Sequence, residues 1–271
     1  MYPASKASAK QQTKSQFRIY ATWFALGATI GFLLGLPVEL GNSPTSWFID
    51  GIWPEALGIF FTVTIIDQLY RQREQRDNRL REAEAKAMEQ QKLKTDLIIQ
   101  LSSRVNSEAV RAAELLKSHN WLKDSSLWGA DLHEANLANA PLSYADLHGV
   151  DFWQANLSGA DLYRANLRNA HLLRADLRNA RLMHSILSNA HLRYANLENA
   201  VLDGADLRGA YLGRANLKSA SITDVKIDES CTLPDGLNWS PDTDLRIFTD
   251  STHPKFWRSK EPSSPAYQKD P

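Results

Sequence analysis

The stretch from residue 130 to residue 224 decides the fold of this chain, because it repeats every five residues. In blocks it reads ADLHE, ANLAN, APLSY, ADLHG, VDFWQ, ANLSG, ADLYR, ANLRN, AHLLR, ADLRN, ARLMH, SILSN, AHLRY, ANLEN, AVLDG, ADLRG, AYLGR, ANLKS and ASITD. The third place holds a large apolar residue throughout, from Leu132 to Ile222, and the pattern continues to Ile227. The first place is almost always Ala, and the departures are Val150, Ser185 and Val225.

A period of five matches neither an α-helix nor a flat strand. Residues five apart on a helix are rotated by about 140°, which would spread the Leu ladder around the whole surface. The simplest solution is a coil in which each block forms one short side and one corner, with Leu and Ala pointing inward. If four blocks complete a coil, residues twenty apart stack at about 4.8 Å, and the repeat makes about five coils.

The fifth place of the blocks alternates in residue type. Every second block ends in Asn, Gly or Ser, from Asn139 to Ser219, whereas the blocks between end mostly in larger residues such as Tyr144 and Arg164. Asn and Gly tolerate the positive φ that the third residue of a type II turn requires. The alternation therefore predicts a positive φ at alternate corners and a different turn at the others.

This register resembles the pentapeptide-repeat family, whose members contain A(D/N)LXX blocks. The resemblance covers residues 125–227 and implies a right-handed, square, parallel β-helix. Two further stretches, 55–74 and 103–122, resemble recurring pieces of bacterial, membrane-anchored members of this family. The resemblance implies a shared layout and no particular reaction.

Composition limits the other possibilities. A hydrophobic content of 43% and a net charge of zero argue against a disordered chain and a general polyanion binder. Cys231 is the single cysteine, so no intramolecular disulfide can form, and a reducing compartment is expected.

The N-terminal part predicts two membrane spans. Residues 1–18 are polar and basic, residues 19–38 carry no charge, and a second apolar stretch covers 53–70. Basic residues flank the two stretches and are missing from the loop between them, so the positive-inside rule puts both termini in the cytoplasm. We expect a multi-pass protein of the bacterial inner membrane or an internal bacterial membrane, with the lipid bilayer as a partner. A cleaved signal peptide is the less favoured alternative.

Particular residues in these spans allow further interpretations. Gly27, Gly31 and Gly35 form a smooth helix face that would allow a homo-oligomer or packing within one chain. Glu55 and Asp67 could belong to an ion pathway, but their places at the two ends of the second span favour structural roles, with Asp67 paired to Arg71.

Residues 71–122 predict a cytoplasmic helical stalk. No Pro or Gly occurs from 68 to 120, and charges alternate in sign, which favours one continuous helix. Its second half carries an apolar stripe, from Leu97 through Leu101 and Val105 to Leu116. The stripe either joins a coiled coil, and so a homo-oligomer, or folds onto the open end of the first coil.

The repeat domain spans 123–228 and is followed by residues rich in large apolar side chains. A solenoid needs a cover for its last coil, so residues 229–259 are interpreted as a C-terminal cap. Residues 260–271 are polar and are expected to be disordered.

The sequence contains no recognisable catalytic or nucleotide-binding motif. His171 and His191 should stack on neighbouring coils, but no carboxylate or thiol near them completes a metal site. The Asp and Asn residues at the second place of the blocks predict a hydrogen-bonding ladder. We therefore expect no enzyme activity, no cofactor and no metal.

The surface charge of the repeat is uneven, since its first coils are acidic and its later coils are basic. The later coils provide a candidate interaction surface for an acidic or phosphate-bearing partner. Its residues are Arg164, Arg168, Arg174, Arg178, Arg181, Arg193, Arg208 and Arg214.

These observations favour a membrane-anchored scaffold that binds an unidentified protein through its solenoid. Some members of the resembled family mimic DNA and bind topoisomerases, which requires an acidic surface. Residues 130–226 hold ten acidic and ten basic residues, so this alternative is less favoured and nucleic acid is not an expected partner. A small transporter or channel subunit is the third possibility.

Overall fold

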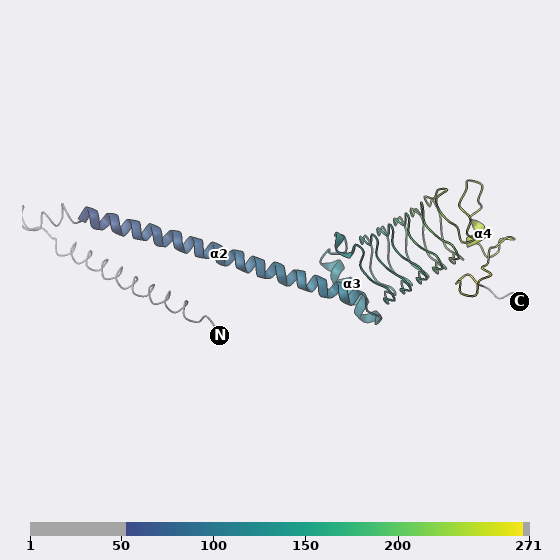
Figure 1. Ribbon diagram of the computed structural model, residues 1–271, viewed down its shortest axis with the longest axis horizontal. Coiled ribbons are helices and arrows are strands. Elements are labelled where there is room, and N and C mark those ends of the chain that lie inside the picture. The colour runs from purple at the N-terminus through teal and green to yellow at the C-terminus, as the bar shows by residue number, and fades with distance from the viewer. Residues whose placement is uncertain (1–52, 268–271) are drawn as a thin grey trace, which may run out of the picture. The chain divides into compact units, whose positions relative to one another are not determined.

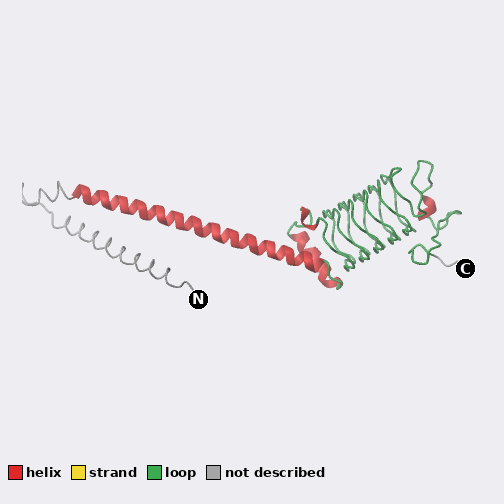
Figure 2. Cartoon of the chain, viewed as in Figure 1, coloured by secondary structure: helices red, strands yellow, loops and turns green. Residues whose placement is uncertain are grey.

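The computed structural model describes residues 53–267. Along the chain, the helical elements are α2 (Trp53–Leu101), α3 (Asn106–Ser118), the 3-10 helix η2 (Ser125–Leu127) and α4 (Arg246–Thr249), and the repeat coils lie between η2 and α4 (Figures 1 and 2). The chain divides into two units, one ending at Leu80 and the other beginning at Arg81. The predicted segment 1–18, the first apolar stretch 19–38 and its glycine face lie outside the described residues.

The predicted second membrane span is wrong. In the described part of the chain, no helix is long and apolar enough to cross a membrane. The reason lies in the spacing of charges, because only residues 56–66 separate Glu55 from Asp67. At 1.5 Å per residue this run covers about 17 Å of a hydrocarbon core of about 30 Å. This finding overturns the transmembrane hairpin and the multi-pass inner-membrane location, and it gives no support to the bilayer as a partner.

Helix α2 is a long helix with solvent-facing side chains over most of its described length. Side chains from Gly58 to Lys92 are exposed, apart from a half-buried Val63. Asp67 accepts a hydrogen bond from Nε of Arg71 at 2.8 Å, which is the predicted pair one turn apart. An exposed pair of this kind contributes little to stability.

The predicted continuous helix breaks between Leu101 and Asn106. No Pro or Gly causes the break; instead, Ser103 takes over the local hydrogen bonds. Its hydroxyl accepts from the Val105 amide at 3.1 Å and donates to Glu108 at 2.7 Å, while its carbonyl accepts from the Asn136 amide at 2.9 Å. The break turns α3 back toward the repeat domain.

The repeat domain is a stack of coils in which residues twenty apart pair as parallel β-bridges. The series runs from Asp131 with Asp151 to Asp206 with Lys226, which confirms the predicted register. A side of an inner coil bonds to both neighbours: the Asp151 amide donates to Ala130 O of the preceding coil at 2.9 Å, and the Phe152 amide donates to His171 O of the following coil at 2.8 Å. The pairing is limited to isolated bridges, so the coils are drawn as loops in Figure 2.

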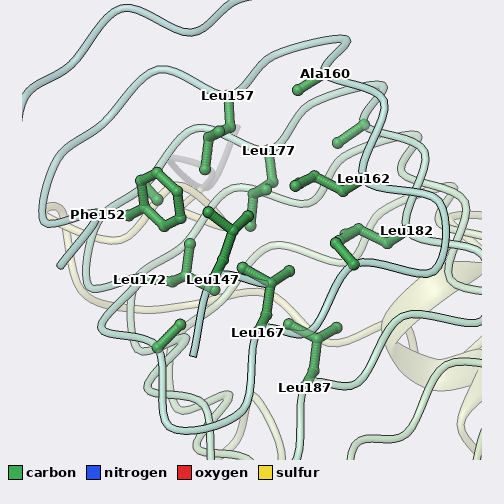
Figure 3. Close-up of a cluster of buried hydrophobic side chains, with 14 of the residues drawn as sticks. Leu147, Phe152, Leu157, Ala160, Leu162, Leu167, Leu172, Leu177, Leu182 and Leu187 are labelled. Atoms are coloured by element: carbon green, nitrogen blue, oxygen red, sulfur yellow. The ribbon is translucent and has the colours of Figure 1, made fainter. Parts of the chain in front are cut away.

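The interior of the stack is filled by the predicted Leu and Ala residues. Leu147, Phe152, Leu157 and their neighbours point into the coil from all sides (Figure 3). The first-place and third-place residues are buried from Leu132 to Leu217. Ser185 replaces an Ala in this series, and its hydroxyl donates to Leu182 O at 2.7 Å, so its burial leaves no polar atom unpaired.

The prediction of two corner types is wrong. Every fifth residue from Gly129 to Asp224 has a positive φ, between 53° and 69°. The corners from Gly129 to Ser219 are closed by the same bond between residues three apart, as from the Ala135 amide to Leu132 O at 3.2 Å. Because these corners share one closure, large residues such as Arg174 and Tyr194 adopt the left-handed conformation as Asn and Gly do.

The second-place Asp and Asn residues bond both along the stack and within their own corners. Asn156 donates to the Asn136 side chain at 3.0 Å, and Asn166 donates to Asp146 at 2.8 Å. Most second-place side chains also accept a bond from the amide two residues later, as Asp151 does from Trp153 at 2.9 Å. These Asx turns give the corner amides an acceptor.

The first coil is covered by the end of α2 and by α3. Leu97 and Leu101 of α2 and Ala109, Ala112 and Leu116 of α3 belong to the same buried core as the Leu ladder. Of the two possibilities for the apolar stripe, the structure has the one in which it packs onto the solenoid. Val105 is the exception, because it lies in the break and is 53% exposed.

The last coils are covered by the residues that follow the repeat. Cys231, Leu233 and Phe248 are buried in the common core, and Trp239 and Trp257 pack against it. The Ser219 amide donates to Thr249 O at 2.7 Å, which gives a corner of the last coil a partner. Residues 260–267 were expected to be disordered, but they lie against the solenoid, where Ser264 is buried and bonds to Arg214 O at 2.8 Å.

Candidate functional site

The structure distributes the eight predicted arginines over several sides of the solenoid. Arg168 and Arg208 lie in one column, two coils apart, with Ser188 between them. Arg174 and Arg214 lie in another column with Tyr194 between them. The eight residues therefore do not form one continuous basic surface.

Three of the arginines form ion pairs within the chain. Arg178 bonds to Asp176 at 2.6 Å, Arg208 to Asp206 at 2.7 Å and Arg214 to Glu261 at 3.3 Å. Their charge is partly neutralised, which weakens them as anchors for a partner.

The other five arginines have no ion pair among the described residues. Nε of Arg168 donates to Ser188 at 3.3 Å, and Arg164 lies over the ring of Tyr163. The Arg181 side chain is exposed and has no hydrogen bond, ion pair or ring contact in the part of the chain that the structure describes. The remaining two, Arg174 and Arg193, meet at one tyrosine.

Arg174, Arg193, Tyr194 and Arg214 form a group that we call the arginine–tyrosine cluster. The guanidinium carbons of Arg174 and Arg193 lie 5.5 and 5.1 Å from the centre of the Tyr194 ring, within the range of a cation–π contact. The Tyr194 hydroxyl donates to Oε1 of Glu261 at 2.7 Å. Hydrogen bonds from Tyr194 and Ser263, together with the Arg214 guanidinium, lower the pKa of Glu261 below its ordinary value.

A second set of rings lies along another corner of the solenoid. Tyr144 and Tyr163 meet edge to face with ring centres 5.5 Å apart, and Tyr163 meets His184 at 6.0 Å. Lys123 lies 5.5 Å from the Tyr144 ring centre and Arg164 lies at the same distance from Tyr163. Stacked coils thus align aromatic and cationic side chains in columns.

His171 and His191 stack as predicted, with ring centres 5.3 Å apart, and Tyr211 continues the column at 5.1 Å. Within residues 53–267, no three His, Cys, Asp or Glu side chains are grouped so that they could hold a metal ion. Burial raises the pKa of the Cys231 thiol to about 12, so this group is protonated at neutral pH.

Sequence reasoning missed Tyr194 and Glu261 as members of a site. The twenty-residue register already places Tyr194 between Arg174 and Arg214, so the columns could have revealed it. Glu261 had no such signal, because it lies outside the repeat in a segment that was expected to be disordered.

Comparison with known proteins identifies the class. A family model described as pentapeptide repeats matches residues 122–154, 145–183 and 185–224, with eight copies. This chain belongs to the pentapeptide-repeat family. No match was found among curated proteins.

Several solved structures are similar to this chain. The pentapeptide repeat protein Rfr23 from the cyanobacterium Cyanothece 51142 is 33% identical over 38% of this chain and 64% of its own length, with a TM-score of 0.31. A pentapeptide repeat protein from the thylakoid lumen of Arabidopsis thaliana is 30% identical over 45% of this chain and 85% of its own, with a TM-score of 0.33. QnrB1, a plasmid-mediated fluoroquinolone resistance protein, is 19% identical over 40% and 62%, with a TM-score of 0.29.

Proposed function

We propose that this protein is a non-catalytic scaffold that binds a protein partner through the outer surface of its solenoid. The observation that carries the proposal is the alignment of aromatic and cationic side chains in columns on that surface. Two such columns are the arginine–tyrosine cluster and the corner formed by Tyr144, Tyr163 and His184. Aromatic residues and arginine are the side chains most enriched at the energetic centres of protein interfaces.

The interior supports a structural role for the repeat. It consists mainly of Leu and Ala side chains, and no buried side-chain nitrogen or oxygen of the described residues lacks a hydrogen-bond partner. A catalytic site usually needs convergent polar groups in a concave pocket. The polar groups of this solenoid are spread along its outer sides instead.

The charge of the solenoid disfavours the DNA-mimic alternative. Residues 130–226 hold equal numbers of acidic and basic residues, ten of each, and unpaired arginines gather around Tyr194. A protein that imitates the phosphate backbone needs a dominantly negative surface.

Crosslinking followed by purification of the full-length protein from its native cells tests the proposal. The double variant Arg174→Gln/Arg193→Gln should lose a partner that the wild-type protein retains. Arg181→Gln is the matched control, because the Arg181 side chain is exposed, has no partner among the described residues and lies on a different side of the coil. We expect this control to retain the partner.

An identical set of crosslinked proteins for the wild type and the double variant would contradict a role for this surface. Inhibition of gyrase supercoiling by the full-length protein would instead favour the topoisomerase alternative. Unfolding curves of both variants show whether a loss of binding reflects a loss of fold.

A further inference from the structure

The segment 259–267, which we call the strap, lies against the arginine–tyrosine cluster. Glu261 provides its charged contact, accepting from the Tyr194 hydroxyl at 2.7 Å and pairing with Nε of Arg214 at 3.3 Å. The Ser264 hydroxyl donates to Arg214 O at 2.8 Å, and Ser264 is buried. The chain itself therefore shows that this cluster binds a carboxylate.

The cluster carries more positive charge than the strap neutralises. The guanidinium groups of Arg174 and Arg193 lie beside the Tyr194 ring, whereas that of Arg214 pairs with Glu261, which is the only carboxylate side chain of the strap. Arg174 and Arg193 are both exposed, and neither has an ion pair among the described residues. The site is thus complementary to a segment with several carboxylates.

Two hydrogen bonds and one ion pair join the strap to the repeat coils, and none of its apolar side chains is fully buried, so a competitor could displace it. Its own backbone bonds are short-range, as from the Ser264 amide to Glu261 O at 2.9 Å and from the Tyr267 amide to Ser264 O at 3.0 Å. Pro265, Ala266 and Tyr267 border a cavity of about 80 Å³ that Trp257 and Lys218 also line, so the packing beneath the strap is incomplete. Segments with few buried contacts open at a low free-energy cost.

We propose that the arginine–tyrosine cluster is a docking site for an acidic peptide segment of the partner, and that the strap occupies it until the partner displaces Glu261. The inference rests on the proposed function, because it names the class of partner that the solenoid binds. A tethered competitor acts at a high effective concentration, so the intact strap weakens the binding of any external acidic segment.

Binding of a fluorescent hexaglutamate peptide to the full-length protein tests this proposal by fluorescence anisotropy. Glu261→Gln removes the internal carboxylate, and we expect it to tighten peptide binding by about tenfold, a typical size for coupled sites. Adding Arg174→Gln and Arg193→Gln to this variant should abolish the gain, whereas adding Arg181→Gln should preserve it. The increase in peptide affinity caused by Glu261→Gln should also become smaller as the salt concentration is raised.

Hydrogen exchange gives a second, independent readout. The peptide should speed exchange of the Ser259, Ser264 and Tyr267 amides in the wild-type protein, because these amides bond within the strap. Peptide affinity that is equal for wild type and Glu261→Gln, or binding that leaves strap exchange unchanged, would overturn the inference. Binding of an oligo-dT strand through Arg174 and Arg193 without binding of hexaglutamate would overturn it in favour of nucleic acid.

The two proposals fail separately. The double variant Arg174→Gln/Arg193→Gln could lose its crosslinked partner while Glu261→Gln leaves the affinity for hexaglutamate unchanged. This result would support the scaffold and exclude the strap as its regulator. An unchanged partner in the double variant would remove the scaffold surface itself.

Discussion

The corner residues of the solenoid all have left-handed backbone conformations, although many of them are Arg, Tyr or Gln. For residues other than Gly, this conformation costs about 1 kcal/mol or more. The cost is tolerated because the corner amides from Gly129 to Gly204 each donate to a carbonyl of the next coil, as Glu134 does to Trp153 O at 2.8 Å. At some Gly corners, a side chain of the preceding coil also lies where an added Cβ would be placed.

Gly149 and Gly159 allow this distinction to be measured. Their φ values are +66° and +67°, but a methyl group added at 159 would lie 2.3 Å from Oδ1 of Asn139, whereas at 149 the nearest atom is 4.0 Å away. We expect Gly149→Ala to lower the free energy of unfolding by about 1 kcal/mol through backbone strain alone. Gly159→Ala should cost about 1 kcal/mol more, since the Asn139 side chain must move. Urea denaturation measures both values.

The double variant Asn139→Gly/Gly159→Ala provides the control for this prediction. It removes the obstructing amide, so the excess cost of Gly159→Ala should disappear. Equal costs for the two single Ala variants would mean that Asn139 rotates away freely.

At the residue scale, the sequence was sufficient for the interior and insufficient for the corners. The spacing of Leu and Ala predicts which side chains are buried, because a period of five leaves only one arrangement that brings them together. The alternation of Asn and Gly with larger residues suggested two kinds of corner. The backbone does not follow this alternation, because φ is positive at every corner from Gly129 to Asp224.

Among the elements, α2 and α3 differ most from what the sequence predicts. Ser102 and Ser103 gave no sign of a break, because the break depends on a bond between Ser103 and Asn136, which are far apart in sequence. The apolar residues of 53–70 suggested a membrane span, but the charges at positions 55 and 67 shorten the run too much. Both predictions failed because the deciding groups lie outside the apolar pattern: Asn136 for the helix break, and the charged residues at 55 and 67 for the span.

The cover of the first coil yields a prediction at this scale. Leu101 is fully buried at the end of α2, whereas Leu93, two turns earlier, is 43% exposed. Leu101→Ala should lower the free energy of unfolding by about 2–5 kcal/mol, since it leaves a cavity beside the first coil. Leu93→Ala should change it by less than about 1 kcal/mol. Similar losses for both variants in urea denaturation would mean that α2 does not cover the solenoid in solution.

At the scale of the whole molecule, the last coil of the repeat is the surface through which copies of the protein would associate if its cover were removed. Residues after 228 provide acceptors for three amides of the last coil: Leu212 bonds to Thr232 O, Arg214 to Pro234 O and Ser219 to Thr249 O, at 2.8, 2.8 and 2.7 Å. Removing these residues would expose the Leu ladder and an unpaired edge, which promotes edge-to-edge association.

A chain truncated after Asp228 should therefore form larger species than the full-length protein in light scattering. A chain truncated after Arg258 is the matched control, because it loses the strap but keeps all three bonds. It should have the same size as the full-length protein. If the chain truncated after Asp228 also had the size of the full-length protein, the last coil would need no cover.

The register of the stack has a consequence for how such a gene can change in length. Bridges between the coils join residues twenty apart through Lys226, and the next bridge, Tyr211 with Thr232, spans one residue more. A duplication of twenty codons that includes Tyr194 would add one complete turn and keep a copy of Tyr194 beside Glu261. A duplication of five codons between these two residues would rotate everything downstream by a quarter turn and carry Glu261 away from Tyr194. Selection for this contact would thus accept a whole added turn there and reject the shorter unit from which the repeat is built.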